Sequence, residues 1–225
     1  MYTPPAFRDD DRASLHATMR AARLANLVTT GSTGIAATPL PLYLEADEGE
    51  RGVLYGHLAR ANPQWKTTLG KTTPGKTTPV GDALAIFMGP DAYISPAWYA
   101  NKATDGRVVP TYNYITVHAY GPIEFFDDAE RLLSVVTRLT NSFETPQPEP
   151  WAVTDAPADF VKAQLRAIVG IRLPITRLEG KRKLSQNRPE GDRDRIAREL
   201  SGSARAGDVL LAAAMPKPVR SDSET

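Results

Sequence analysis

The sequence predicts a mainly β protein of the α+β class, with antiparallel strands and peripheral helices. Segments with the apolar and β-branched residues typical of strands outnumber those with helical periodicity. Consecutive strands are joined by short turns, which is typical of antiparallel pairing. No Gly-x-Gly-x-x-Gly motif follows a strand and no P-loop occurs, so the sequence supports neither a Rossmann dinucleotide site nor a nucleoside triphosphatase.

The first third of the chain predicts a helix, a hairpin, a third strand and a short helix. Apolar residues at helical spacing behind a run of three aspartates predict a helix over residues 10–24. The turn Gly31–Gly34 then joins two strands, and prolines in the second make it an edge strand or interrupt it. Asn62 and Pro63 suit the N-cap and first position of a helix over residues 63–69. The strands predicted here cover residues 26–30, 35–46 and 53–57.

The middle of the chain predicts a loop and the longest strands. Residues 71–79 repeat a Lys-Thr-Thr-Pro unit, a composition typical of a solvated loop. The apolar run 83–88 suits a strand buried on both faces, and strand character returns at residues 93–95. Residues 111–121 alternate Tyr, Thr and His with Asn, Ile, Val and Ala, so they predict a long strand that resumes at residues 123–126.

The last third predicts three helices and a final strand. The helices cover about residues 127–143, 157–168 and 192–200. The strand covers residues 171–178 and is broken at Pro174, and the basic segment Lys181–Lys183 follows it. We expect one domain over residues 1–200 and a partly disordered C-terminal tail over residues 201–225.

Composition excludes several classes of protein. The 225 residues include 27 Lys and Arg, 26 Asp and Glu, and no cysteine. The net charge of +1 argues against binding to nucleic acid or membrane by bulk charge alone. Without cysteine there are no disulfides, iron–sulfur clusters or thiol nucleophiles, and the three histidines lie far apart, so no metal site is predicted. No apolar run approaches the roughly 20 residues of a membrane span, and we expect a cytoplasmic protein without membrane contact.

One segment has the pattern of an anion site. His57 ends a strand, Arg60 lies in the following turn, and Asn62 and Lys66 flank the start of the short helix. Free backbone amides at a helix N-terminus, together with two cations, favour an anion such as phosphate. The alternative is that Asn62 only caps the helix and that both cations are solvated.

Two aromatic segments offer surfaces for a planar ligand. Residues 90–99, which include Trp98, combine three aromatics and two prolines at a strand end and turn. The alternative is that this segment packs in the core. Asn113 alternates with tyrosines in a strand, where it would pair with the edge of a heterocycle or be satisfied as a strand amide.

A basic run precedes three polar residues near the C-terminal end of the predicted domain. Lys181–Lys183 and Arg188 flank Ser185, Gln186 and Asn187. Such a run contacts a phosphate or a DNA backbone, or is a solvated surface. The sequence contains no clear helix-turn-helix and no Gly-x-Ser-x-Gly elbow, so no catalytic residue is assigned.

Five longer motifs occur in order along the chain. They are Met1–Phe7, Gly56–Pro63, Phe87–Tyr99, Val109–Tyr114 and Lys183–Arg188. Together they resemble the PaiB-type FMN-binding negative transcriptional regulators, and the resemblance covers about residues 1–200. The repeat at residues 71–79 lies in a loop between motifs, as an insertion would.

The resemblance implies a split β-barrel related to the pyridoxamine-phosphate-oxidase-like flavoproteins, and a homodimer with FMN at the subunit interface. The phosphate would lie near Arg60, Asn62 and Lys66, and the aromatic and amide motifs would frame the rest of the pocket, partly from the partner chain. On this resemblance the cofactor-binding residues are His57, Arg60, Asn62, Lys66, Trp98, Asn113, Ser185, Gln186 and Asn187.

The predicted function is that of an FMN-binding split-barrel protein acting as a negative transcriptional regulator. Three alternatives remain. One is a flavin-dependent oxidoreductase acting on a small substrate, and another is a haem-binding split-barrel protein with His57 or His118 as axial ligand. The third is a DNA-binding repressor that needs no flavin. The visible absorption of the purified protein separates the flavin and haem proteins from a repressor without cofactor.

Overall fold

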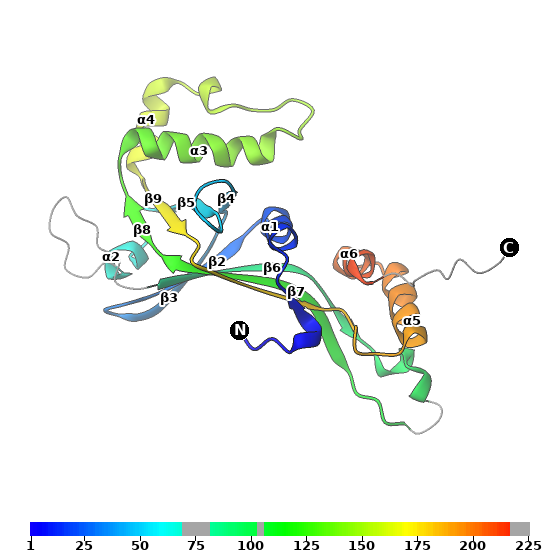
Figure 1. Ribbon diagram of the computed structural model, residues 1–225. Helices are drawn as coiled ribbons and strands as arrows, with labels where there is room; N and C mark the ends of the chain where they lie inside the picture. Colours follow the sequence, from blue (N-terminus) through cyan, green and yellow to red (C-terminus); the bar gives the residue numbers. More distant parts are fainter. Residues whose placement is uncertain (69–81, 103–105, 217–225) are drawn as a thin grey trace. The chain divides into compact units, whose positions relative to one another are not determined.

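The computed structural model describes residues 1–68, 82–102 and 106–216 (Figure 1). The chain forms two compact units. The larger unit comprises Asp11–Met88 and Val117–Glu179, and the smaller unit comprises Met1–Asp10, Gly89–Thr116 and Gly180–Thr225. The predicted loop at residues 71–79 and the end of the tail lie outside the described residues.

The strands form two sheets, and the predicted α+β class with mainly antiparallel strands is confirmed. One sheet has the order β1-β10-β7-β6-β2-β3 and the other has the order β4-β5-β9-β8. Strands β6, β7 and β10 each contribute residues to both units. The strands are β1 (Arg8–Asp9), β2 (Ala25–Gly31), β3 (Gly34–Leu40), β4 (Tyr43–Glu45), β5 (Val53–Ala59), β6 (Asp82–Ile94), β7 (Thr111–Pro122), β8 (Glu124–Phe126), β9 (Ile168–Pro174) and β10 (Arg177–Lys183).

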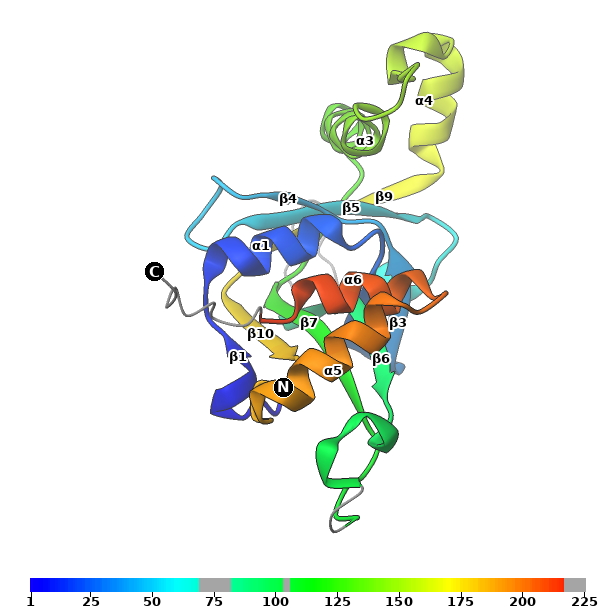
Figure 2. The ribbon, with the colours of Figure 1, turned by 90° about the vertical axis from the view of Figure 1, so that its right-hand side faces the viewer.

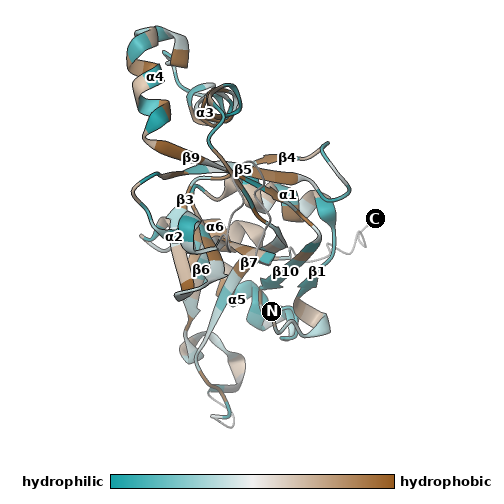
Figure 3. Cartoon of the chain, turned by 90° about the vertical axis from the view of Figure 1, so that its left-hand side faces the viewer, coloured by the Kyte–Doolittle hydropathy of each residue, from teal (hydrophilic) through white to brown (hydrophobic). Residues whose placement is uncertain are grey.

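The four-stranded sheet belongs to the larger unit. Strands β5 and β9 pair antiparallel over their whole length, from Val53 opposite Pro174 to Ala59 opposite Ile168. Apolar residues run along both strands (Figure 3). Because side chains alternate between the two faces of a strand, one face of this sheet enters the main core of the unit. The largest fully buried side chains of that core are Phe87, Phe125, Met19, Leu27 and Leu54.

Four helices belong to the larger unit. They are α1 (Arg12–Ala21), α2 (Gln64–Thr68), α3 (Ala129–Glu144) and α4 (Ala158–Arg166). Asp11 and Asp128 cap α1 and α3 by accepting hydrogen bonds from the backbone N–H groups of Ser14 and Arg131. Helices α3 and α4 lie side by side (Figure 1) and share a second apolar cluster with strand β8. That cluster centres on Phe126, Leu132, Val135 and Leu165.

The smaller unit has its own core beneath helices α5 (Glu190–Ser201) and α6 (Ala206–Ala214), which pack against each other (Figure 2). Ile94 and Ile115 of the strands meet Ile196 of α5 and Leu211 of α6 in this core. The domain boundary predicted at residue 200 stays a prediction, although α6 shows that residues beyond it include an ordered helix. Short 3-10 turns occur at Pro5–Phe7, Pro96–Trp98, Ala100–Lys102 and Val153–Asp155.

Three strand boundaries differ from those predicted. The predicted strand 35–46 is divided into β3 and β4, which belong to different sheets. The runs 83–88 and 93–95 form the single strand β6, because the intervening Gly-Pro-Asp continues the extended backbone. The predicted last strand ends as β9 at Pro174, and the chain pairs again as β10. The basic segment Lys181–Lys183, which was predicted to follow the last strand, is therefore part of strand β10.

Candidate functional site

The predicted cofactor-binding residues are distributed over both units. His57, Arg60, Asn62 and Lys66 belong to the larger unit. The smaller unit contains Trp98, Asn113, Ser185, Gln186 and Asn187.

Asn62 caps helix α2 and fixes the preceding turn. Its Oδ1 accepts a hydrogen bond from the backbone N–H of Gln64 at 2.9 Å, and its Nδ2 donates to Thr38 Oγ1 at 3.0 Å. The buried Gln64 side chain donates to Leu27 O at 3.1 Å and to Thr29 Oγ1 at 3.0 Å. The capping interpretation of Asn62 is therefore confirmed, and the polar contacts of this turn hold α2 against strands β2 and β3.

Arg60 connects the end of β5 to the segment that joins α4 to β9. Its Nε donates to Arg166 O at 2.8 Å and its Nη2 donates to Ile168 O at 3.1 Å. Its Nη1 lies 3.5 Å from Asp127 Oδ2. Two edges of the guanidinium thus satisfy carbonyl groups near a helix C-terminus. Lys66 is exposed, with its ammonium 5.3 Å from the centroid of the Trp65 ring.

His57 lies on β5 opposite Gly170 of β9. Its Nδ1 is buried and has no hydrogen-bond partner among the described residues. Burial lowers the pKa of His57, because removal from water penalises the charged imidazolium. A Cβ atom at Gly170 would lie 2.4 Å from the ring of Phe126, so this glycine leaves room for the aromatic ring beside the strand pair.

In the smaller unit, Asn113 and Ser185 are held together. Asn113 of β7 is fully buried, and its Nδ2 donates to Ser185 Oγ at 2.9 Å. The Ser185 hydroxyl donates in return to Asn113 Oδ1 at 3.2 Å. Ser185 has a φ of 61°, in the left-handed region that non-glycine residues rarely adopt. Strained backbone of this kind is often found at functional sites, and here it orients a serine toward a buried amide.

The neighbours of Ser185 have different surroundings. The Oε1 of Gln186 accepts from the backbone N–H of Leu184 at 2.7 Å, and its Nε2 donates to Arg182 O. Asn187 is exposed, and Trp98 is half-buried against the core of the unit. The structure therefore brings Asn113, Ser185 and Gln186 to the end of β10, and it leaves Asn187 open to solvent.

Three cations and three tyrosines gather in the smaller unit, in what we call the cation–tyrosine cluster. Its members are Lys181, Lys183, Arg188, Tyr2, Tyr99 and Tyr114. The Nζ of Lys181 donates to Tyr2 O at 3.2 Å and lies 5.2 Å from the centroid of the Tyr114 ring. The guanidinium carbon of Arg188 lies 4.7 Å from the centroid of the Tyr99 ring.

Among the described residues, no ion pair compensates the positive charge of this cluster. The Nζ of Lys183 donates to Thr111 Oγ1 and, at 2.6 Å, to Tyr112 O. None of the three cations pairs with a carboxylate in the part of the chain that the structure describes. Burial lowers the pKa of Lys183, and the positive charges of Lys181 and Arg188 lower it further. An anion placed here would relieve this repulsion.

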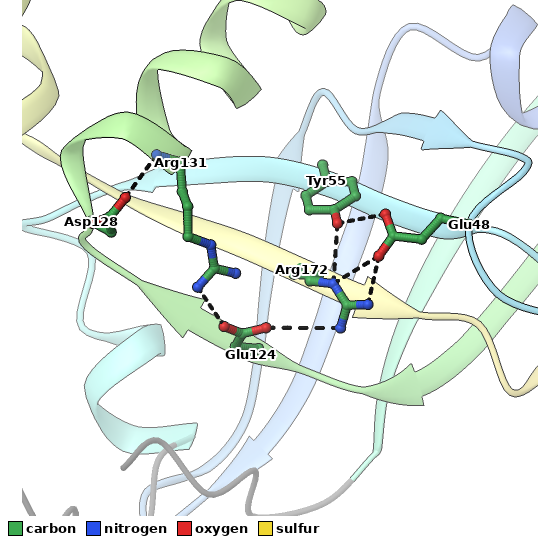
Figure 4. Close-up of polar contacts among 6 residues, drawn as sticks. All are labelled: Glu48, Tyr55, Glu124, Asp128, Arg131 and Arg172. Atoms are coloured by element: carbon green, nitrogen blue, oxygen red, sulfur yellow. Dashed lines mark hydrogen bonds and ion pairs between the residues drawn. The ribbon is translucent and has the colours of Figure 1, made fainter. Parts of the chain in front are cut away.

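A second polar group, which the sequence did not indicate, lies on the four-stranded sheet of the larger unit (Figure 4). Arg172 of β9 donates through Nη2 to Glu48 Oε1 at 2.7 Å and through Nε to Tyr55 Oη at 3.1 Å. Tyr55 in turn donates to Glu48 Oε2 at 2.7 Å. On the other side Arg131 of α3 pairs with Glu124 at 2.8 Å. These charges compensate one another, so this group holds the sheet and α3 together.

The described residues contain no group of three His, Asp or Glu side chains that would hold a metal ion. Among the same residues, no helix is both long enough and apolar enough to cross a lipid bilayer.

The chain matches known proteins over most of its length. A family model described as "Putative FMN-binding domain" matches residues 1–177. The Bacillus subtilis "Protease synthase and sporulation protein PAI 2" is 29% identical over 200 residues, which are 89% of each chain. The Emericella nidulans "Uncharacterized protein AN0679" is 34% identical over 184 residues, which are 72% of this chain and 73% of the relative.

Two solved structures share the fold. The "FAD and Heme binding protein from Mycobacterium smegmatis" has a TM-score of 0.55 and 17% identity, and the match covers 78% of this chain and 73% of that chain. The "Flavocytochrome Anf3 from Azotobacter vinelandii" has a TM-score of 0.54 and 16% identity, with 83% and 74% covered. These likenesses confirm the split-barrel fold. The family model together with the Bacillus subtilis relative confirms the PaiB-type resemblance, and the family model confirms FMN as the cofactor.

Proposed function

Since this chain belongs to the FMN-binding domain family, we propose that the cation–tyrosine cluster of its smaller unit binds the phosphate of FMN. Bound FMN supplies transfer of one or two electrons through its isoalloxazine ring. The contribution of this chain is to bind and orient that ring and to set the charge around it. The cytoplasmic location stays a prediction.

The uncompensated charge of Lys181, Lys183 and Arg188 is the observation that carries this proposal. A phosphate dianion beside Lys183 would offset the repulsion that lowers the pKa of its ammonium. The neighbouring tyrosines offer aromatic faces and hydroxyl groups of the kind that line cofactor sites. Asn113 and Ser185 present an amide and a hydroxyl, which suit the polar edge of a flavin.

The alternative phosphate site is the one predicted from the sequence, at Arg60, Asn62 and Lys66. The side chain of Asn62 is engaged by Gln64 and Thr38, and two edges of the Arg60 guanidinium are engaged by backbone carbonyls. Binding a phosphate through these residues would require some of those hydrogen bonds to break. We favour the cluster because none of its three cations pairs with a carboxylate among the described residues, whereas Arg60 already lies 3.5 Å from Asp127.

Comparing FMN with riboflavin distinguishes the two phosphate sites. We expect Lys183→Met to weaken FMN binding about tenfold to a hundredfold, because a charge-assisted hydrogen bond contributes roughly 1.5–3 kcal/mol. Riboflavin lacks the phosphate, so its affinity should change less than about threefold. The measurement is fluorescence quenching of each flavin by wild-type protein, Lys183→Met and Arg60→Ala.

Two results would overturn the assignment to the cluster. One is an equal loss of FMN and riboflavin affinity in Lys183→Met, which would indicate general damage to the site. The other is a phosphate-specific loss in Arg60→Ala together with an unchanged Lys183→Met, which would instead establish the site predicted from the sequence.

Absorption of the purified protein separates the flavin function from the haem alternative. Two structural relatives are named for haem or a flavocytochrome, and His57 has a buried Nδ1 without a partner among the described residues. We nevertheless expect flavin bands and no Soret band, because the family matched is an FMN-binding one. Oxidoreductase activity on a small substrate would then be sought by following flavin reduction with candidate donors under anaerobic conditions.

We also propose that the protein is a homodimer. Tyr93 and Tyr112 form an edge-to-face pair with ring centroids 5.7 Å apart, and both remain about half exposed. Exposed aromatic pairs are typical of interaction surfaces, and a two-fold interface uses the same surface on both protomers. Light scattering should therefore give twice the 24.5 kDa of one chain. The double change Tyr93→Asp and Tyr112→Asp should give the monomer, whereas Phe160→Asp on α4 should leave the dimer intact.

The regulatory role predicted from the resemblance implies contact with DNA, and we expect direct binding to be weak. Of the basic run, Lys181 is 8% exposed and Lys183 is hydrogen-bonded within its unit, which leaves few cations for a DNA backbone. Binding to a candidate promoter should fall steeply with salt. The triple change of Lys181, Lys183 and Arg188 to alanine should make the plot of log affinity against log salt concentration less steep. The slope should change by about one unit for each DNA phosphate that the variant no longer binds. Sequence-specific nanomolar binding unaffected by the triple change would contradict this expectation.

A further inference from the structure

A pocket of about 410 Å³ opens between helices α3 and α4 and the end of β5, within the larger unit. Seven residues line it: Arg60, Asp127, Ala129, Leu132, Lys162, Leu165 and Arg166. An apolar cavity of about 150 Å³ accepts benzene, so the volume here suits roughly two six-carbon rings or a chain of similar size. None of the residues of the cation–tyrosine cluster contributes to it.

The lining of this pocket is amphipathic. Leu132 and Leu165 are buried members of the apolar cluster beneath α3 and α4, and they provide an apolar floor. The lining also includes three cationic residues, Arg60, Lys162 and Arg166, against the single carboxylate of Asp127. The lining of the pocket therefore combines buried leucines with a formal net positive charge.

The cations of the lining are only weakly compensated. Lys162 lies 4.0 Å from the exposed carboxylate of Asp159, and Arg60 lies 3.5 Å from Asp127, which are long distances for ion pairs at a solvated surface. The guanidinium of Arg166 forms no ion pair among the residues that the structure describes. The carboxylate of a ligand would pair with Arg166 and Lys162, and the apolar part of the same ligand would cover Leu132 and Leu165.

We propose that this pocket binds a small amphiphilic carboxylate, with the carboxylate at Arg166 and Lys162 and an apolar body of about two rings against Leu132 and Leu165. No residue of the cation–tyrosine cluster lines this pocket, so the site is additional to the flavin site if the phosphate assignment proposed above holds. Neutral apolar molecules are disfavoured because they would leave the cations of the lining uncompensated.

The test uses the FMN-loaded protein and two matched probes, 2-naphthoate and neutral 2-naphthalenemethanol. Isothermal titration should show one molecule of 2-naphthoate bound per chain, with a dissociation constant below about 1 mM. The alcohol should bind at least about tenfold more weakly, because it lacks the charge. The flavin absorption should show that FMN stays bound throughout.

Two substitutions address the pocket and one serves as a control. Ala129 is the first residue of α3 and is exposed, so Ala129→Trp fills the pocket from its rim and should abolish 2-naphthoate binding. Arg166→Glu should weaken that binding about tenfold. Arg195→Glu makes the same charge change on the exposed face of α5, outside the pocket, and should leave binding unchanged.

Several outcomes would overturn the proposal. They are no binding of 2-naphthoate at 1 mM, equal binding of the acid and the alcohol, and binding that survives Ala129→Trp with a normal circular dichroism spectrum. Stoichiometric release of FMN by 2-naphthoate would show that the pocket belongs to the flavin site. That last result would also support the phosphate site at Arg60, so failure here is distinguishable from failure of the proposed flavin function.

Discussion

Replacement of Gly121 by alanine should unfold the protein or lower its stability by about 3 kcal/mol, the upper end of the usual cost of overpacking. Gly121 lies near the end of β7, where a Cβ atom would lie 1.9 Å from the carbonyl oxygen of Pro174. Two backbone hydrogen bonds hold the chain in place just after Pro174. The N–H of Thr176 donates to Tyr120 O at 2.9 Å, and the N–H of Ile175 donates to Gly52 O at 3.0 Å. The obstacle is backbone and not a flexible side chain, so local repacking cannot remove it.

Thermal and urea unfolding followed by circular dichroism measure this effect, with Gly191→Ala as the matched control. Gly191 lies in the first turn of α5, and a Cβ atom there meets nothing within 4 Å. Alanine has the higher helix propensity, so the control should be neutral or stabilising by up to about 1 kcal/mol. Equal stability of Gly121→Ala and the wild type would contradict the close approach of β7 and β9.

The second large effect is expected at Arg172. Its guanidinium holds Glu48 and Tyr55 and lies 3.9 Å from Glu124 (Figure 4). Arg172→Met keeps most of the apolar stem but leaves the Glu48 carboxylate without its cation, whereas Glu124 keeps its ion pair with Arg131. We expect a loss of about 1–3 kcal/mol, the range of charge-assisted hydrogen bonds, reduced by the partial exposure of both partners. Chemical denaturation at pH 7 measures it.

The loss of stability caused by Arg172→Met should depend on pH, in a direction set by the pKa of Glu48. Burial raises the pKa of Glu48, but hydrogen bonds from Arg172 and Tyr55 outweigh it and hold the pKa below its ordinary value of 4.5. A carboxyl whose pKa is lower in the folded state contributes stability above pH 4.5, and this contribution is lost as the pH falls further. The difference between wild type and Arg172→Met should therefore be largest near neutral pH and shrink below pH 4.5.

A control substitution separates this network from an ordinary surface ion pair. Arg138 of α3 pairs with Glu45, and its side chain is 54% exposed. Arg138→Met should cost less than about 1 kcal/mol, as exposed pairs do. If Arg172→Met proves no more costly than Arg138→Met, the network does not hold the sheet and α3 together.

One part of the candidate site could be predicted from the sequence, because side chains alternate between the two faces of a strand. The alternating pattern of residues 111–121 indicated that Asn113 points opposite to its neighbouring tyrosines, and Asn113 is fully buried while Tyr112 is exposed. The cation–tyrosine cluster was missed because the last strand was predicted to end at residue 178, before the basic segment that belongs to β10. Without strand β10 there was no reason to place Lys181 and Lys183 on a common face.

The anion site predicted at the start of α2 is an example of what the sequence could not predict. Arg60 was predicted to bind an anion because it lies in the turn just before the predicted helix over residues 63–69. The partners that engage Arg60 are the carbonyl groups of Arg166 and Ile168, more than one hundred residues away. Local pattern contains no information about such contacts, because they depend on which strands pair and where β9 begins.

By itself the sequence determined the α+β class, the capped helices, the family and its cofactor. These follow from periodicity, from capping residues and from motifs, all of which act over a few neighbouring residues. Only the tertiary structure decided that residues 35–46 divide between two sheets, that the cations of β10 gather beside tyrosines, and that α3 and α4 enclose an amphipathic pocket. Each of these depends on contacts between residues distant in sequence, which form because burying apolar faces and pairing backbone groups favours one arrangement of the strands.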